Sequence, residues 1–259
     1  MQVVIPMTGE GARFKAAGYQ TLKPMITVGG KPIIEYVIDM FPGADSYIFI
    51  CREDHDQEYN FSTYFPSISP KAKVVTVSEP YLKLGPVYAA LQAKHLINDN
   101  EPVMLSYCDY FMDWDFNDFT QEVERSGVDG SIVCYQGFHP HLLHEGNVYA
   151  GCRVNDQLEL LEIKEKFSFE QDKTLGQHSV GAYYFRLGSL MKQYFKATMD
   201  YGEALNGEYY ISLVYPLLLA DGLKVGVYNK VPHFCQWGTP QDLEEFLYWQ
   251  SIFKEHNYA

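Results

Sequence analysis

Long apolar runs are absent from this sequence, and none approaches the ~20 residues that a membrane-spanning helix needs. Basic residues are few, because 20 Lys and Arg stand against 33 Asp and Glu and leave a net charge of −13. This acidity argues against a general binder of nucleic acid or of membrane surfaces, and we expect neither as a partner. Any anionic ligand would therefore have to be bound by a few local cations.

Paired cysteines are also absent. The five cysteines stand singly at positions 51, 108, 134, 152 and 235, with no C-x-x-C motif. We interpret them as reduced core residues and expect a cytoplasmic protein. No serine nucleophile elbow and no Cys–His signature are found, so the sequence gives no support for a hydrolase with a catalytic triad.

The most informative stretch is residues 1–32. The β-branched run at 3–5 predicts a buried strand. The polar stretch after it contains the glycines Gly9, Gly11 and Gly18 and the cations Arg13 and Lys23. Glycines let backbone N–H groups approach a phosphate closely, and the cations supply charge-assisted donors. The stretch lacks the Gly-Lys-Ser/Thr ending of a P-loop, and Phe14 breaks the dinucleotide fingerprint. We expect no helix before Pro32.

Three motifs point to a family: G-x-G-x-R-F at 9–14, K-P at 23–24 and G-K-P-I-I-E-Y at 30–36. They resemble the amino-terminal signature of the sugar-phosphate nucleotidyltransferases, or sugar-phosphate pyrophosphorylases. The longer motif I-P-M-x-G-x-G-x-R-F-x-x-A-G-Y, at 5–19, is most similar to a bacterial branch found in capsule and surface-polysaccharide pathways. The resemblance extends over nearly the whole chain and implies a GT-A-like nucleotidyltransferase fold.

The alternation of strands and helices independently predicts an α/β fold with a mainly parallel, Rossmann-like mixed sheet flanked by helices. We expect strands at 46–51, 73–78, 102–107, 130–135, 148–154, 158–163, 177–183 and 224–228. We expect helices at 33–41, within 53–65, at 87–97, 117–126, 189–196 and 208–220, and from 240 onward. We predict a single domain, residues 1–259, with a nucleotide-binding half at about 1–112 and an acceptor-binding half at about 113–259.

The resemblance implies roles for residues at the strand ends, where such sheets bind ligands. The loop after the first strand would bind the nucleotide through Met7, Thr8, Gly9, Glu10 and Gly11. Glu79 and Gly85 would frame the base. Arg13 would neutralise the triphosphate, Lys23 would steady the α-phosphate, and Asp109 would hold Mg²⁺ as the cofactor.

The identity of the base is a separate expectation, based on Glu79. The family often carries Gln at this position in enzymes for uridine or thymidine nucleotides, and Gln can both donate and accept a hydrogen bond. An ionised Glu only accepts, so it would suit the amino groups of cytosine or guanine. We therefore expect CTP or GTP as the nucleotide partner.

For the phosphorylated acceptor, the resemblance implies six binding residues: Tyr149, Gly151, Glu165, Lys166, Ser179 and Gly181. The lysine would contact the acceptor phosphate, and the glutamate would accept from acceptor hydroxyls. Two departures stand out. Phe167 replaces a usual Pro, and Gln236 replaces an aspartate that commonly completes the metal site. A neutral amide is a poorer Mg²⁺ ligand than a carboxylate. The family's metal site with two carboxylates is therefore not expected in this chain.

The densest histidine group is His139, His141 and His144. No Cys or carboxylate stands near it at ligand spacing, and Pro140 disrupts helical presentation. We therefore predict no metal site there and place the group in a loop near the acceptor.

Together these features predict an enzyme that transfers NMP from an NTP to a phosphorylated small molecule and releases pyrophosphate. A phosphomonoester is already anionic at pH 7, so it can attack the α-phosphorus without a general base. A sugar 1-phosphate is the favoured acceptor, for the synthesis of surface-polysaccharide precursors.

Several alternatives stay open. A cytidylyltransferase could act on a non-sugar phosphate. Gln236 favours a non-catalytic paralogue that binds a nucleotide sugar. The run Asp113-Trp114-Asp115 has the spelling of a glycosyltransferase metal motif, although it lies several residues beyond the expected strand end. The sequence is compatible with both a monomer and a homo-oligomer.

Overall fold

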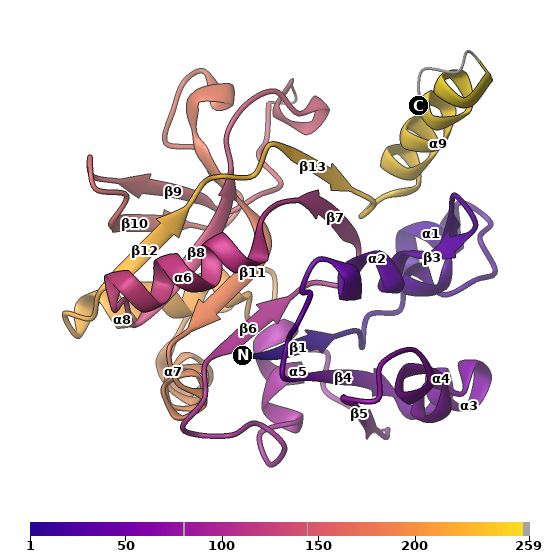
Figure 1. Cartoon of the computed structure of the whole chain (residues 1–259), viewed down its shortest axis with the longest axis horizontal. Coiled ribbons are helices and arrows are strands. Elements are labelled where there is room, and N and C mark those ends of the chain that lie inside the picture. The colour runs from indigo at the N-terminus through magenta and orange to yellow at the C-terminus, as the bar shows by residue number, and fades with distance from the viewer. Residues whose placement is uncertain (80, 144, 256–259) are drawn as a thin grey trace.

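The computed structural model describes residues 1–79, 81–143 and 145–255. Within these residues a nine-stranded sheet forms the centre of the molecule, with strand order β10-β9-β11-β6-β1-β4-β5 and with β8 and β12 attached through β11 (Figure 1). Its strands are β1 (Gln2–Pro6), β4 (Ser46–Arg52), β5 (Ala72–Val77), β6 (Val103–Ser106), β8 (Gly130–Tyr135), β9 (Gly151–Val154), β10 (Leu160–Lys164), β11 (Gln177–Phe185) and β12 (Val225–Tyr228).

The half of the sheet built from the first part of the chain is parallel. β1 pairs in parallel with β4 and β6, and β5 pairs in parallel with β4. On the other side β11 runs antiparallel to β6, β8 and β9, while β12 is parallel to β8. The expected α/β class is therefore confirmed. Because β1, β4, β5 and β6 run in one direction, the loops after them meet at one edge of the sheet.

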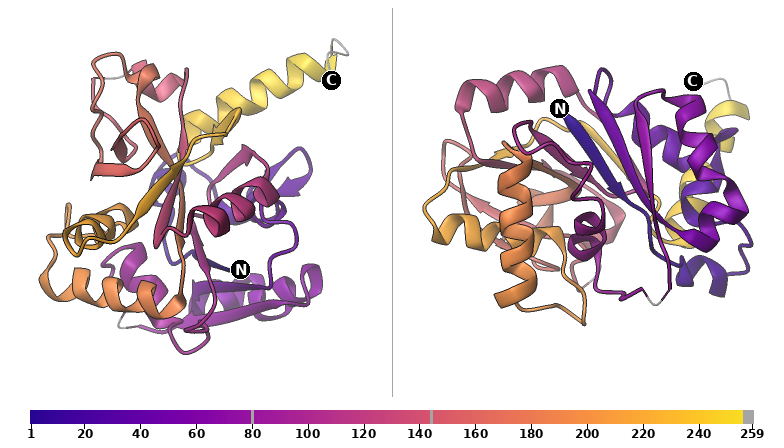
Figure 2. Two further views of the ribbon diagram at one scale, coloured as in Figure 1. Left: turned by 60° about the vertical axis from the view of Figure 1, so that its left-hand side comes forward. Right: turned by 90° about the horizontal axis from the view of Figure 1, so that it is seen from below.

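Helices cover both faces of this sheet (Figure 2). Val3 and Ile5 of β1 face a core shared with α2, α4 and α6, whereas Val4 faces a core shared with α5, α7 and α8. This alternation follows from the two-residue period of a strand. The helices are α1 (Ala12–Ala16), α2 (Ile33–Asp39), α3 (Glu53–Tyr59), α4 (Phe61–Ile68), α5 (Pro86–Gln92), α6 (Phe116–Ser126), α7 (Gly188–Tyr201), α8 (Tyr215–Ala220) and α9 (Pro240–Glu255). No helix in the described ranges combines the length and apolar character needed to cross a membrane.

A third, smaller core joins the two ends of the chain. Phe14 of α1 packs with Val28 of the short hairpin β2 (Thr27–Val28) and β3 (Lys31–Pro32), and with Trp237 and Leu243 near the start of α9. Beyond these contacts α9 extends away from the sheet, as both figures show. This core therefore holds the segment after β1 against the carboxy-terminal segment.

Two helical expectations in the first half of the chain need correction. A helix does precede Pro32, because α1 follows directly after the glycine-rich loop. The sequence gives no signal for it, since its N-cap is Gly11 at φ 64°, without a side-chain cap or an acidic first turn. The region 53–65 contains two helices rather than one, because Asn60 adopts φ 53° between α3 and α4.

Two further differences affect the second half. The helix expected at 208–220 is wrong over its first part, because Asn206 and Gly207 have positive φ and helical structure begins only with the 3₁₀ turn η4 (Ile211–Val214). A two-stranded antiparallel sheet of β7 (Tyr110–Asp113) and β13 (His233–Gln236) was not expected. These four-residue strands are too short to show a period.

Candidate active site

The loops after β1, β5 and β6 enclose a cavity of about 410 Å³. Eight of the residues assigned to nucleotide binding or catalysis line it: Met7, Thr8, Gly9, Glu10, Gly11, Lys23, Gly85 and Asp109. Tyr81 also lines it, and its hydroxyl lies 3.2 Å from that of Thr8. The parallel strands thus bring together segments that are about a hundred residues apart in the sequence.

Lys23 and Asp109 form an ion pair in the wall of this cavity. The ammonium Nζ lies 2.5 Å from Oδ2 of Asp109, and both side chains are largely shielded from solvent. Burial alone would lower the pKa of Lys23, but the Asp109 carboxylate outweighs this effect and raises that pKa. Lys23 is therefore a stable cation at neutral pH, held at the point where β6 ends.

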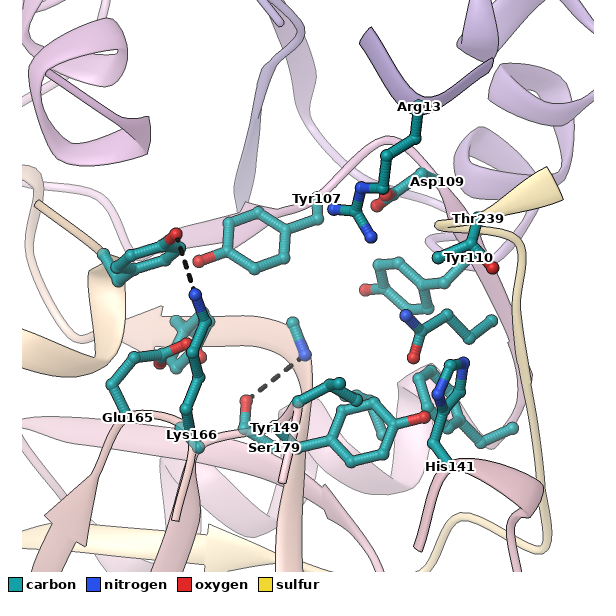
Figure 3. Close-up of a pocket in the computed structure, with 18 residues that line it drawn as sticks. Arg13, Tyr107, Asp109, Tyr110, His141, Tyr149, Glu165, Lys166, Ser179 and Thr239 are labelled. Carbon is teal, nitrogen blue, oxygen red and sulfur yellow. Dashed lines mark hydrogen bonds between the residues drawn. The ribbon is translucent and has the colours of Figure 1, made fainter. Parts of the chain in front are cut away.

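A second cavity, of about 390 Å³, is also lined by Asp109 (Figure 3). Five of the six residues assigned to the acceptor line it: Tyr149, Glu165, Lys166, Ser179 and Gly181. Arg13 also lines this cavity rather than the first one. Figure 3 shows Arg13 and Asp109 on one side of the cavity, with Glu165 and Lys166 on another.

The two cavities share part of their walls, formed by Tyr107, Asp109 and Tyr210. Tyr107 packs closely over Gly181, where φ is 97° and an added Cβ would lie 2.7 Å from the tyrosine ring. Only glycine satisfies both requirements at this position. Gly181 therefore leaves the space that the Tyr107 ring occupies, and it also lines the cavity.

Glu165 and Lys166 are held by the segment before α8. Ser212 donates a hydrogen bond to the Glu165 carboxylate, and burial raises the pKa of that carboxyl. Lys166 Nζ lies 3.4 Å from the Tyr210 hydroxyl and 5.1 Å from the centre of its ring. The Tyr210 hydroxyl in turn donates to Glu208, 2.6 Å away, which lines the nucleotide cavity. One segment therefore touches both cavities.

Two expected site residues do not line either cavity. Glu79 forms an ion pair with Arg52, at 3.0 Å, because Arg52 stands at the end of the neighbouring strand β4. Its carboxylate also accepts from the Tyr81 backbone N–H. Gly151 has a packing role, since an added Cβ would lie 2.3 Å from the Phe167 carbonyl oxygen. The assignments of Glu79 to the base and of Gly151 to the acceptor gain no support from this geometry.

The Asp-x-Asp run lies elsewhere. Asp113 ends β7, Trp114 packs against Phe41, and Asp115 caps α6 by accepting from the Asp118 N–H. Both aspartates line a cavity distinct from the two described above. This position argues against the glycosyltransferase reading. His144, the third member of the expected histidine group, lies outside the described residues.

Sequence reasoning missed several cavity residues, among them Tyr107, Glu208 and Tyr210. Residues 208–210 were assigned to the start of a helix, so their position between the two cavities was not predicted. The one available signal was Asn206-Gly207, a pair typical of a turn.

The comparisons decide the family. Residues 3–173 match the model of the MobA-like NTP transferase domain. The chain belongs to this family. It is therefore a nucleotidyltransferase. A comparison with curated protein sequences finds no match.

Two solved structures share the fold of this nucleotidyltransferase. One is a nucleoside-diphosphate-sugar pyrophosphorylase from Vibrio cholerae RC9, with TM-score 0.73 and 20% identity, covering 95% of this chain and 99% of that one. The other is a Bacillus anthracis protein named as a glucose-1-phosphate thymidylyltransferase, in complex with a sucrose, with TM-score 0.73 and 15% identity, covering 96% and 94% of the two chains. At these identities the likeness establishes the fold alone.

Nucleotidyltransferases of this family generally use a divalent metal, and Asp109 and Gln236 are the residues in this chain that could contribute to such a site. An added Cβ at Gly238 would lie 3.4 Å from Asp109 Oδ2 and 2.8 Å from Gln236 Nε2, so both side chains face this glycine. Gln236 Oε1 is buried and has no hydrogen-bond partner among the described residues. No group of three or more His, Cys, Asp or Glu within those residues could hold a metal by itself. Asp109, together with Gln236 if its amide turned to present Oε1, would supply two oxygen ligands at most, and phosphates and water would supply the rest.

Proposed function

We propose that the chain transfers NMP from an NTP to a phosphorylated small molecule, most simply a sugar 1-phosphate, and releases pyrophosphate. The observation that carries the proposal is the shared wall of Tyr107, Asp109 and Tyr210 between two cavities. An NTP in the first cavity and an acceptor in the second would meet at this wall. Direct transfer requires such a meeting of α-phosphorus and acceptor phosphate.

The residues around the wall support a division of roles. Lys23 is positioned to contact the α-phosphate, because it is held beside Asp109 in the nucleotide cavity. Arg13 and Lys166 enter the acceptor cavity and supply the positive charge that an incoming phosphate needs. Glu165 is positioned to accept from acceptor hydroxyls. Residues at about 1–112 would bind the nucleotide, and those at about 113–259 the acceptor.

A divalent cation, Mg²⁺ by preference, would be held by Asp109 and Gln236. When bound, it neutralises charge on the phosphate oxygens as the transfer proceeds. Lys23 already pairs with Asp109. We infer that this lysine turns toward phosphate oxygens when the carboxylate takes up a metal, so that neither charge is left unpaired.

The expected preference for CTP or GTP was based on Glu79, which pairs with Arg52 outside the nucleotide cavity. The acceptor cavity combines a carboxylate with many aromatic rings: Tyr107, Tyr110, Tyr149, Tyr183, Tyr210 and Phe234. Aromatic faces beside hydrogen-bonding groups suit a sugar ring, and the sequence motifs link such an activity to surface-polysaccharide precursors.

The test is a screen of pyrophosphate release with Mg²⁺, across the four NTPs and a set of phosphorylated acceptors. The set should contain several sugar 1-phosphates, a phosphorylated alcohol and a phosphorylated amide. We expect one sugar 1-phosphate to exceed the non-sugar compounds by at least about tenfold in kcat/KM. Faster turnover of a non-sugar phosphate would replace the proposed acceptor class. Acceptor-independent NTP hydrolysis alone would contradict the proposal.

A further inference from the structure

One histidine without a role in the family resemblance, His141, lines the acceptor cavity (Figure 3). It belongs to the 3₁₀ turn η2 (Pro140–Leu143), between β8 and β9. In Figure 3 it lies across the cavity from Glu165 and Lys166, on the same side as Thr239. The acceptor cavity therefore has a histidine at the end opposite its lysine.

The orientation of His141 is fixed by Asp242, in the first turn of α9. Nε2 of His141 lies 2.5 Å from Oδ1 of Asp242, and only 14% and 12% of the two side chains are exposed. The other oxygen, Oδ2, accepts from the backbone N–H and the hydroxyl of Thr239, at 3.1 and 2.7 Å. Burial would raise the pKa of Asp242, but the donors His141 and Thr239 outweigh it and lower that pKa. Asp242 is therefore ionised, and both its oxygens are engaged.

The ring of His141 is also packed on two sides. His139 stacks on it, with ring centres 5.5 Å apart and an angle of 7° between the planes. Tyr149 meets it edge-on at 6.1 Å, and the Tyr149 hydroxyl lies 3.0 Å from Nδ1 of His139. A ring held in this way has lost its rotamer freedom before any ligand binds. Such preorganisation is typical of a recognition group, because it lowers the entropic cost of binding.

We propose that His141 is an acceptor-binding residue that contacts a hydroxyl or amide group of the acceptor, at the end of the acceptor away from its phosphate. Asp242 is a positioning residue that acts through His141, since its own oxygens are occupied. The inference rests on the proposed function, because the acceptor phosphate must lie near Arg13 and Lys166. We expect the group of the acceptor that contacts His141 to be neutral and polar, because Asp242 already balances the charge of a protonated His141.

The alternative is that His141 and Asp242 have a purely structural role, in which their contact only holds the turn η2 against α9. The variant His141→Gln separates the two roles. A glutamine amide can still donate to Asp242 from about the same position, but it lacks the imidazole ring. His141→Ala removes both the contact and the ring. His95→Gln, at an exposed position, is the matched control.

The experiment measures kcat and both KM values for pyrophosphate release by the full chain, with the best NTP and acceptor from the screen. We expect His141→Gln and His141→Ala both to raise the acceptor KM about tenfold, the effect of about one lost hydrogen bond to a buried group. The NTP KM should stay within about twofold of wild type, and Asp242→Asn should raise the acceptor KM by a smaller factor.

Each result decides something. A normal acceptor KM in His141→Gln with a raised one in His141→Ala would mean that the pair is only a structural fastening, and would overturn this inference. Equal increases in both KM values would overturn it as well, since they indicate a general distortion of the site. A wild-type chain that uses no acceptor at all would instead refute the proposed function.

Discussion

Lys23 and Asp109 lie 86 positions apart in the sequence, yet their side chains are in contact at 2.5 Å in the wall of the nucleotide cavity, and Asp109 also lines the acceptor cavity. Lys23 comes from the turn η1 (Lys23–Met25), and Asp109 follows β6. The pair therefore joins the glycine-rich segment to the strand end that carries the candidate metal carboxylate. It gives the first prediction.

Asp109→Asn should lower Mg²⁺-dependent pyrophosphate release by at least about 10²-fold, because the amide cannot balance a cation or fix Lys23. The free energy of unfolding should fall by roughly 1–3 kcal/mol, because the Lys23 ammonium, which is largely shielded from solvent, loses its anionic partner. Steady-state kinetics and urea unfolding measure the two effects. Asp113→Asn, at an exposed position after Met112, is the control. Unfolding of the Asp109 variant at room temperature would make this aspartate a structural residue.

Arg13→Ala should lower kcat/KM about 10²-fold or more, because it removes a charge that acts on phosphates in the transition state. Arg13 is exposed on α1, so thermal unfolding should be nearly unchanged. Lys15→Ala removes an exposed cation from the same helix and should have little effect. Equal activities of the two variants would mean that Arg13 contributes only to general electrostatic attraction.

Glu79→Gln should leave the ranking of CTP, GTP, UTP and dTTP unchanged and alter each kcat/KM by less than about threefold. We expect so small an effect because Glu79 pairs with Arg52 and does not line the nucleotide cavity. Exposed ion pairs contribute little to stability or binding. A competition among the four triphosphates tests this expectation. A reversed ranking in the variant would restore Glu79 as a base-reading residue.

The buried His139 should make the fold sensitive to acid. Burial, with a further contribution from His141, lowers its pKa from 6.5 to about 4. The unfolded chain therefore binds this proton more readily than the folded one, so stability is complete above about pH 6.5 and falls as the pH drops toward 4. We expect this residue to account for a loss of roughly 2 kcal/mol in the free energy of unfolding between about pH 7 and about pH 5.

Urea unfolding at the two pH values measures the loss, and the comparison is with His139→Asn. That variant keeps an acceptor near the Tyr149 hydroxyl but does not titrate in this range. Its free energy of unfolding should therefore fall by roughly 2 kcal/mol less than that of the wild type between the two pH values. An identical dependence in both proteins would mean that His139 is already protonated, or solvated, in the folded chain.

The sequence by itself determined the alternation of elements and the position of most loops that line the two cavities. These features depend on local chemistry. β-branched runs form buried strands, glycines permit the turn at Gly11, and Thr239 with Pro240 opens a helix, where Thr239 and Asp242 now form reciprocal hydrogen bonds. The loop at 7–11 and the pair Glu165 and Lys166 were assigned through the family resemblance, which short runs of consecutive residues can carry, and both segments line a cavity.

Only the tertiary structure decided which of these segments meet. Glu79 was assigned to the base from its strand-end position, but Arg52 on the neighbouring strand binds its carboxylate. Gln236 and Asp109 face the same glycine, Gly238, because β13 pairs with β7, and these four-residue strands show no period in the sequence. Tyr210 reaches both cavities because the chain turns at Asn206-Gly207 and is not helical between that turn and Tyr210. His141 becomes a candidate only when α9 brings Asp242 to it. Long-range pairing depends on complementary charge and packing between distant segments, and a single sequence does not reveal those partners.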